Sequence, residues 1–167
     1  GAGRAGMTGP ILITAGGTGG HLFPAEALSA ELTRRGRRVL FVNDTRGKGF
    51  ARADGAIETA RISAATFESR NPFALIKAAF QILAGIVQAH ALIGRKRPAA
   101  AIGFGGYPSL PAMIAAWLRG VPSAIHEQNS VLGRANRALA GRVDLIASSF
   151  PTLEKSGGAR VALTGNP

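Results

Sequence analysis

The chain has 167 residues, of which 46% are hydrophobic, and its formal net charge is +11. The hydrophobic content excludes a disordered chain, and the length predicts one domain with its own core. The absence of cysteine excludes disulfides and thiolate metal sites. The charge indicates an anionic partner, unless it reflects only a generally basic proteome. No nucleic-acid motif accompanies it and aromatic residues make up only 6% of the chain, so we expect no nucleic-acid partner.

Strand-like and helical segments alternate along the chain. Residues 10–15 predict a buried strand, and the helix after it is expected to have Pro24 in its first turn and to end at Gly36. Further strands are expected at 38–43, 58–62, 99–104, 122–126, 143–147 and 161–163, and further helices at 73–94, up to Leu118 and at 132–140. This alternation predicts an α/β fold with a Rossmann-like doubly wound parallel sheet, in which ligands bind beyond the carboxyl ends of the strands.

A glycine-rich turn with the sequence GGTGGH, residues 16–21, joins the first strand to its helix. Glycines let the backbone turn sharply and let a ligand approach bare N–H groups. The start of a helix carries a partial positive charge, so the turn suits a phosphate or a diphosphate. The alternative is a tight turn that binds nothing, for which one glycine would suffice.

Two further loops follow later strands. The loop Gly103–Pro111 contains two adjacent glycines and enters a helix, so by the same argument it is a second place for an anion. Together the two glycine loops have the groups to hold one diphosphate. Residues 126–129 (HEQN) follow an apolar strand and offer donors and acceptors suited to sugar hydroxyls or a uracil. Alternatively, Glu127 and Asn129 only cap the next helix.

The segment 73–94 predicts a helix that is apolar around more of its surface than packing on a sheet requires. Its uncharged stretch from Ala78 to Ile93 has 16 residues, which is short of the ~20 that a membrane span needs. We therefore expect a helix at the membrane surface, with Arg95, Lys96 and Arg97 at its end to meet anionic lipid. A fully buried helix or an interface with another protein chain is the alternative.

Taken together, AGGTGGHLFPA, GFGGYPSLP, AIHEQNSVLGRAN and TGNP resemble the N-terminal half of the MurG family of peptidoglycan glycosyltransferases, in order from about Pro10 to Pro167. The resemblance implies one half of a two-domain GT-B glycosyltransferase that acts with inversion. It implies transfer of N-acetylglucosamine from UDP-GlcNAc to the C4 hydroxyl of the muramoyl sugar of lipid I, which forms lipid II. Residues 1–7 are expected to be an expression remnant with a start Met, and residues 8–167 the acceptor-binding domain. Without the donor domain we expect no activity.

The resemblance also implies roles for individual residues. The expected donor contacts are Thr18, Gly19, Gly20 and Asn129. The residues expected to hold the acceptor diphosphate are Gly16, Gly17, Gly105, Gly106, Tyr107 and Ser109. His21 is a candidate base or phosphate contact, because imidazole exchanges a proton near neutral pH, unless it only bonds the backbone at the helix start. Glu127 is the alternative base.

A membrane patch is implied as well, at the cytoplasmic face of the bacterial inner membrane. Its expected apolar members are Ile76, Phe80, Leu83, Ile86 and Trp117, with Ile86 where a tryptophan can occur. Its expected cations are Lys77, Arg95, Lys96 and Arg97, and Arg134 and Arg137 are expected closer to the acceptor. The implied partners are UDP-GlcNAc, mainly through the C-terminal domain, lipid I and anionic lipids. No cofactor is implied, and no His, Asp or Glu cluster demands a metal.

Two alternatives remain open at this point. An NAD(P)-binding domain of an oxidoreductase would place a third glycine where Leu22 stands, although Asp44 follows the second strand about where a ribose-binding acid would lie. A non-enzymatic basic module that binds membranes would share the charge and the apolar helix. Binding of NADH would favour the first alternative. Sedimentation with anionic vesicles that competing DNA does not disturb would favour the second, whereas salt-dependent DNA binding without vesicle binding would favour a nucleic-acid version of it.

Overall fold

The computed structural model describes residues 8–44, 56–66, 71–151 and 160–167, so the prediction for residues 1–7 lies outside it. Seven parallel strands form one sheet in the order β3-β2-β1-β4-β5-β6-β7. The strands are β1 (Ile11–Thr14), β2 (Val39–Asp44), β3 (Ile57–Ile62), β4 (Ala100–Gly103), β5 (Ser123–Glu127), β6 (Leu145–Ser148) and β7 (Arg160–Leu163). Each strand was expected from the sequence within one or two residues of these bounds, and the Rossmann-like parallel sheet is confirmed.

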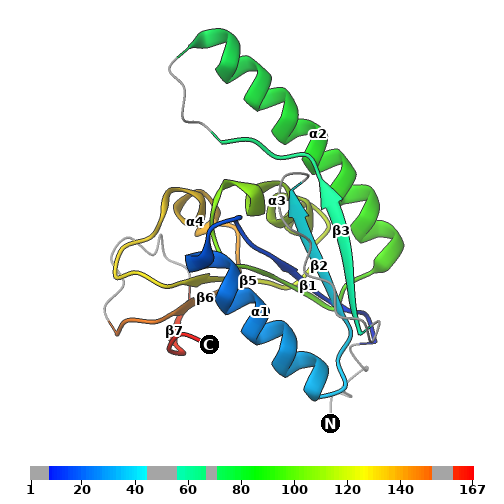
Figure 1. Cartoon of the computed structure of the whole chain (residues 1–167), viewed down its shortest axis with the longest axis vertical. Helices are drawn as coiled ribbons and strands as arrows, with labels where there is room; N and C mark the ends of the chain where they lie inside the picture. Colours follow the sequence, from blue (N-terminus) through cyan, green and yellow to red (C-terminus); the bar gives the residue numbers. More distant parts are fainter. Residues whose placement is uncertain (1–7, 45–55, 67–70, 152–159) are drawn as a thin grey trace.

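Helices cover both faces of the sheet (Figure 1). They are α1 (Gly19–Arg34), α2 (Pro72–Lys96), α3 (Leu110–Leu118) and α4 (Arg134–Leu139), with a short 3-10 helix η1 (Tyr107–Ser109) before α3. Apolar residues of α1 pack with Ile13 and Phe41 on one face of the sheet. Residues of α2, α3 and α4 pack with Leu12 and Ile125 on the other face, where the larger part of the core lies.

The strand order reverses between β1 and β4. β1 pairs with β2 on one side and with β4 on the other, and the chain crosses from β3 to β4 through α2. At such a switch point the chain leaves the two central strands toward opposite faces of the sheet, and ligands bind beyond the carboxyl ends of these strands. The loops here are the two glycine-rich ones, because Thr14 at the end of β1 pairs in register with Gly103 at the end of β4.

The first helix begins earlier than the sequence predicts. α1 starts at Gly19, so Pro24 lies in its interior and not in its first turn. A proline inside a helix removes the hydrogen bond to the carbonyl four residues earlier, here that of Gly20. The first turn forms all the same, because Thr18 O accepts from the N–H groups of His21 and Leu22 at 3.0 and 2.9 Å. The glycine turn is therefore shorter than expected, and His21 belongs to the helix.

The long helix α2 projects past the sheet (Figure 1). Asn71 begins it by accepting a hydrogen bond from Phe73 N on its Oδ1 at 2.9 Å, and it ends at Arg97 in the left-handed region with φ 46°. By length and composition alone this 25-residue helix qualifies as a membrane span, with a mean hydropathy of 1.5. The sequence-based exclusion of a span, which counted only the uncharged stretch, is not supported by that criterion. α2 nevertheless packs along one side against α3 and β3.

Candidate functional site

The two glycine-rich loops touch at the switch point. Gly16 N donates to Gly105 O at 2.9 Å, and Gly105 and Gly106 have φ of 86° and 78°. A Cβ atom at Gly106 would lie 2.8 Å from Gly16 Cα, and one at Gly16 would lie 3.1 Å from Gly106 Cα. Glycine is thus required at these positions both by conformation and by the close approach of the two backbones.

His21 lies against this glycine contact. Cβ atoms placed at Gly16, Gly105 and Gly106 would each meet its imidazole ring at 3.1 to 3.4 Å. Its Nδ1 is buried and has no hydrogen-bond partner among the described residues. Buried polar atoms in proteins are nearly always paired, so an unpaired one beside a pocket is suited to pair with a ligand. The alternative that His21 only bonds the backbone is not supported for this nitrogen.

Glu127 is the last residue of β5, where it pairs with Ser148 of β6, and its carboxylate points into the protein. It is only 1% exposed. Its Oε1 accepts from Asn129 N and Nδ2, both at 3.0 Å, and its Oε2 accepts from Gly133 N and Asn136 Nδ2, both at 2.9 Å. Four donors therefore hold this carboxylate, which in turn shapes the loop from Gln128 to the start of α4. Gly133 precedes α4, and no side chain of the described residues bonds the free N–H groups of that helix, so the alternative that Glu127 and Asn129 only cap it is not supported.

A pocket of about 280 Å³ opens between the glycine contact, β5 and α4. Of the residues expected from the sequence, it brings together His21, Gly105, Gly106, Tyr107, Glu127 and Asn129. Gly16 lies behind it, and Ser109 does not line it, because Ser109 Oγ donates to Gly106 O at 2.8 Å and holds the turn. Gly17, Thr18, Gly19 and Gly20 are exposed outside the pocket, at the end of the turn and the start of α1.

Two further residues of α4 line the same pocket. Asn136 is buried, and its Oδ1 has no partner among the residues that the structure covers. Arg134 lines the pocket as expected, whereas Arg137 turns back to donate to Leu132 O at 3.1 Å and does not line it. Asn136 was not expected from the sequence, although its place in a helix beginning just after HEQN is a signal that points to it.

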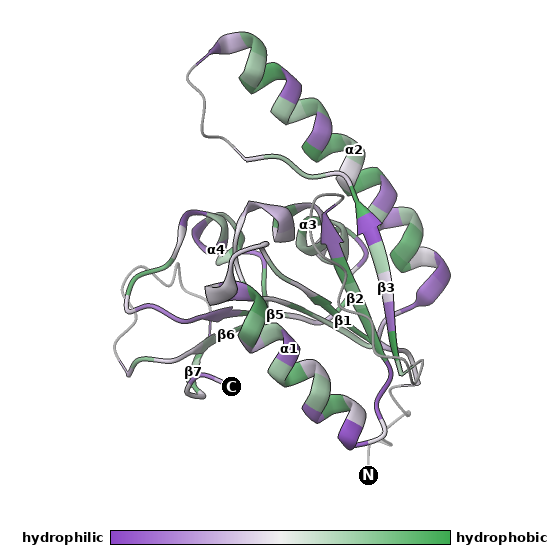
Figure 2. Cartoon of the chain, in the orientation of Figure 1, coloured by the Kyte–Doolittle hydropathy of each residue, from purple (hydrophilic) through white to green (hydrophobic). Residues whose placement is uncertain are grey.

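Much of α2 is hydrophobic (Figure 2), and an apolar stripe runs along its exposed side. Its members are spaced three and four residues apart, as on one face of a helix, and are 55 to 81% exposed: Phe73, Ile76, Phe80, Leu83 and Val87. Ile76, Phe80 and Leu83 were expected there. Ile86 is only half-buried beside the packed residue Gly85 and does not belong to the stripe, so the expectation for Ile86 differs from the structure.

Trp117 is exposed on a different helix from the stripe. It is near the end of α3, with the guanidinium of Arg142 5.4 Å from its ring centre. A Cβ atom at Gly94 would lie 2.7 Å from Arg119 Nη2, so this end of α3 lies beside the end of α2. Gly94 is some 27 Å along the helix from Ile76, at 1.5 Å per residue. The end of α3 that carries Trp117 therefore lies beside the second half of α2 and not beside its projecting half.

The four expected cations differ in how free they are. Lys77 is exposed within the projecting half of α2, and Arg95 and Arg97 are exposed at its other end. Lys96 forms an ion pair with Glu58 of β3 at 2.5 Å and is half-buried. The exposed positive charge among these four cations therefore lies at both ends of α2, and one of the four is already paired.

Comparisons with known proteins agree with one another. The family model described as the glycosyltransferase family 28 N-terminal domain matches residues 11–148. A protein of Chelativorans sp. (strain BNC1) is 53% identical over 158 residues, and one of Mesorhizobium japonicum is 52% identical over 160 residues. Both are named UDP-N-acetylglucosamine--N-acetylmuramyl-(pentapeptide) pyrophosphoryl-undecaprenol N-acetylglucosamine transferase. This chain spans 42% and 43% of their lengths.

The solved structures give the same result. The crystal structure of Acinetobacter baumannii MurG superposes with a TM-score of 0.71 at 29% identity, over 95% of this chain and 46% of that one. An Arabidopsis thaliana glycosyltransferase crystallised with UDP-L-rhamnose superposes with a TM-score of 0.60 at 12% identity, which shows the fold alone. The expected Rossmann-like half of a GT-B glycosyltransferase is thus confirmed, and the oxidoreductase alternative is not supported. The chain belongs to glycosyltransferase family 28, whose N-terminal domain it contains.

Proposed function

We propose that this chain is the acceptor-binding half of an inverting N-acetylglucosaminyltransferase. The full protein would transfer N-acetylglucosamine from UDP-GlcNAc to the C4 hydroxyl of the muramoyl sugar of lipid I, an undecaprenyl-diphospho-linked acceptor, and form lipid II. The observation that carries the proposal is the pocket at the switch point, lined by the glycine contact and by unpaired polar atoms. The names of relatives that are about half identical to this chain support it.

In this proposal His21 is the general base. Transfer with inversion needs a base beside the attacking hydroxyl, and the imidazole is the only ring nitrogen base among the described residues that line the pocket. Glu127 is the weaker candidate, because both of its oxygens already accept two hydrogen bonds. Asn129 and the exposed residues 18–20 would contact the donor from this side of the interdomain cleft, and the glycine contact would hold the acceptor diphosphate.

The stripe of α2 supports a peripheral position at the cytoplasmic face of the inner membrane. Apolar side chains on a helix enter the headgroup region, and cations at its ends attract anionic lipid. Such an arrangement would hold the pocket close to the surface from which a lipid-linked acceptor is presented. The same stripe could instead be covered by another protein chain, which the vesicle experiment described in the Discussion distinguishes.

The proposal is tested by restoring the missing half. This chain is joined to the C-terminal half of the Mesorhizobium japonicum relative, and lipid II formation from UDP-GlcNAc and lipid I is measured. We expect activity in the joined protein and none in this chain alone. In the joined protein, His21→Ala should lower the rate by about 10² to 10⁴, the range for loss of a general base, and Asn129→Ala should lower it as well. No product from a folded joined protein would contradict the proposal.

A further inference from the structure

Arg134 is an unpaired cation on the wall of the pocket. It is exposed, begins α4, and has no hydrogen-bond or ion-pair partner within the described part of the chain. The next two arginines differ, because Arg137 donates to Leu132 O at 3.1 Å and Arg142 donates to Ala138 O at 2.8 Å. Of these three arginines, only Arg134 has its guanidinium free for a ligand in the pocket.

Arg134 does not serve to neutralise the buried carboxylate of Glu127. A guanidinium beside Glu127 would most simply neutralise that charge, but no ion pair within 4.0 Å joins the two. The Glu127 oxygens are held by N–H groups of Asn129, Gly133 and Asn136 instead. Hydrogen bonds from several N–H groups stabilise a buried carboxylate without a cation. The positive charge of Arg134 is therefore available to an anion from outside.

The unpaired atoms of the pocket narrow the chemistry of that ligand. Asn136 Nδ2 donates to His126 O at 3.0 Å and to Glu127 Oε2 at 2.9 Å, so its free Oδ1 is an acceptor. A ligand hydroxyl would donate to it. His21 Nδ1 is the second unpaired atom. The pocket thus offers an acceptor for a hydroxyl, a ring nitrogen and a free guanidinium, a combination that fits a sugar carrying a phosphate.

We propose that Arg134 binds the diphosphate of a sugar-diphosphate ligand in this pocket. The planar guanidinium can donate two parallel hydrogen bonds to phosphate oxygens, and Gly105 and Gly106 line the same pocket. The inference rests on the proposed function and names the side chain that pairs with the charge of its substrate. A lipid-linked acceptor and a nucleotide-sugar donor both carry a diphosphate, so Arg134 recognises chemistry that the two share.

The test measures binding to the 167-residue chain by calorimetry. Geranyl diphosphate stands for the lipid-linked diphosphate, and UDP stands for the nucleotide diphosphate. We expect Arg134→Ala to weaken binding of at least one of them by about tenfold or more, as for loss of a charge-assisted hydrogen bond. Arg134→Lys should retain part of the affinity, and Arg134→Ala should reduce the salt dependence of binding. The matched control Arg137→Ala, on the same helix, should bind as the wild type does.

Each outcome is decisive. A loss confined to geranyl diphosphate supports the inference and assigns Arg134 to the lipid-linked ligand. A loss confined to UDP supports it and assigns Arg134 to the nucleotide, and a loss with both supports the shared role. Wild-type affinities in Arg134→Ala, or no binding of either probe to the wild type, would overturn the inference. In that case lipid II formation by the joined protein carrying Arg134→Ala would show that the proposed function still stands.

Discussion

The pocket at the switch point and the stripe of α2 are incomplete in opposite ways. In the pocket, buried polar atoms of His21 and Asn136 lack partners. On the stripe, side chains such as Phe73 and Phe80 are largely exposed to water. Folding normally pairs buried polar atoms and covers large apolar side chains, so both regions lack something that the described chain does not supply. The pocket is suited to bind a polar ligand, and the stripe is suited to bind an apolar surface.

The two halves of α2 differ in how much of their apolar surface the rest of the domain covers. The half that follows Ala84 packs against the domain through Gly85, Ala89, Leu92 and Ile93, whereas the half before it buries only Ala78. Both halves are similarly apolar, so composition alone does not tell which surface is covered by the fold. The packed half holds the exposed half in place, and disrupting it should therefore have the largest effect.

The largest expected effect is that of Gly85→Ala. A Cβ atom there would lie 1.9 Å from the backbone oxygen of Ser63, so α2 has to move away from the end of β3. We expect unfolding free energy to fall by about 3 kcal/mol, as for severe overpacking, even though alanine is the better helix former. Chemical denaturation measures it. The control Ala84→Val adds more bulk to an exposed neighbour and should change stability by about 0.5 kcal/mol or less. Equal effects of the two would contradict this packing.

The next largest effect is expected in the pocket, for Glu127→Gln. An amide group replaces one oxygen by a donor that faces N–H groups which now donate to Glu127. Leaving such buried donors unpaired should cost about 2 to 3 kcal/mol and loosen the start of α4. Thermal unfolding measures the first effect, and the affinity for geranyl diphosphate measures the second. Glu26→Gln on α1 is the control, expected to be close to wild type. An unchanged melting temperature in Glu127→Gln would mean that the carboxylate does not organise this loop.

The fold and much of the pocket could be predicted because they follow from local rules. Strands alternating with helices and right-handed crossovers lead to this sheet, and glycines after β1 and β4 lead to a ligand site at the strand ends. The contribution of Asn136 could not be predicted in this way. It lines the pocket because Glu127 folds the loop before α4, and that contact depends on tertiary packing and not on spacing.

Three details could not be predicted for similar reasons. Pro24 is a common first-turn residue, but two glycines before it can also form helix, and the structure shows that they do. Ile86 and Ile76 have the same chemistry, and only packing against the rest of the domain shows that Ile86 is partly covered. Trp117 lies at the level of the second half of α2 because α3 runs alongside that half, an arrangement that periodicity within one helix does not reveal.

A smaller effect, about 2 kcal/mol in membrane binding, is expected for Ile76→Glu combined with Phe80→Glu. Each wild-type side chain would bury part of its apolar surface in a membrane, and loss of both should lower the partition constant by about 30-fold. Co-sedimentation with phosphatidylcholine vesicles that contain phosphatidylglycerol measures it. Gln81→Glu with Gln88→Glu adds the same two charges away from the stripe and should have a smaller effect. Unchanged sedimentation of the stripe variant would show that a different surface of the chain binds the vesicles. The stripe would then be free to bind another protein.

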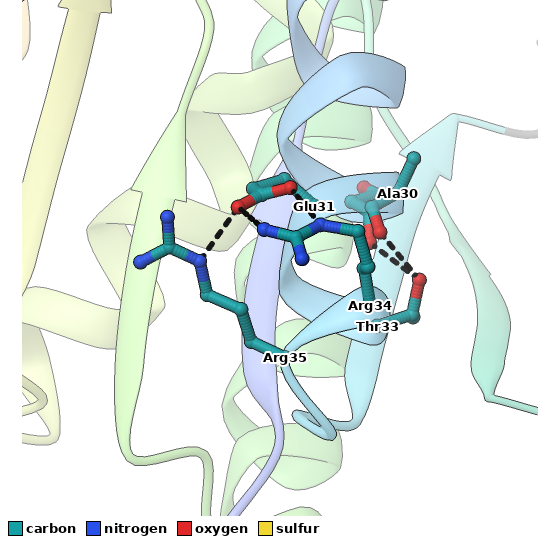
Figure 3. A network of polar contacts seen from close by, with 6 residues as sticks. Ala30, Glu31, Thr33, Arg34 and Arg35 are labelled. Atoms are coloured by element: carbon teal, nitrogen blue, oxygen red, sulfur yellow. Dashed lines mark hydrogen bonds and ion pairs between the residues drawn. The ribbon is translucent and has the colours of Figure 1, made fainter.

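The smallest effect is expected at the end of α1, where charges already satisfy one another (Figure 3). Glu31 accepts from Arg34 Nε at 2.7 Å and Nη2 at 2.6 Å, and from Arg35 Nε at 2.6 Å. Hydrogen bonds first from Arg34 and then from Arg35 lower the pKa of Glu31 to about 2. Because this pKa lies below that of the unfolded chain, the pairs stabilise the fold above pH 4.5 and lose this effect as the pH falls toward 2.

The pairs lie at the surface, where the side chains of Glu31 and Arg34 are 38% and 71% exposed, so their contribution is screened and small. Glu31→Gln should lower the melting temperature at pH 7 by about 2 °C or less, and the difference from the wild type should vanish near pH 2 and shrink in 1 M salt. Scanning calorimetry at the two pH values measures it. A difference that persisted at low pH and high salt would mean that Glu31 acts through packing. In that case the end of α1 would not be a region whose charges are paired within the chain, and its contrast with the unpaired atoms of the pocket and the exposed stripe would be lost.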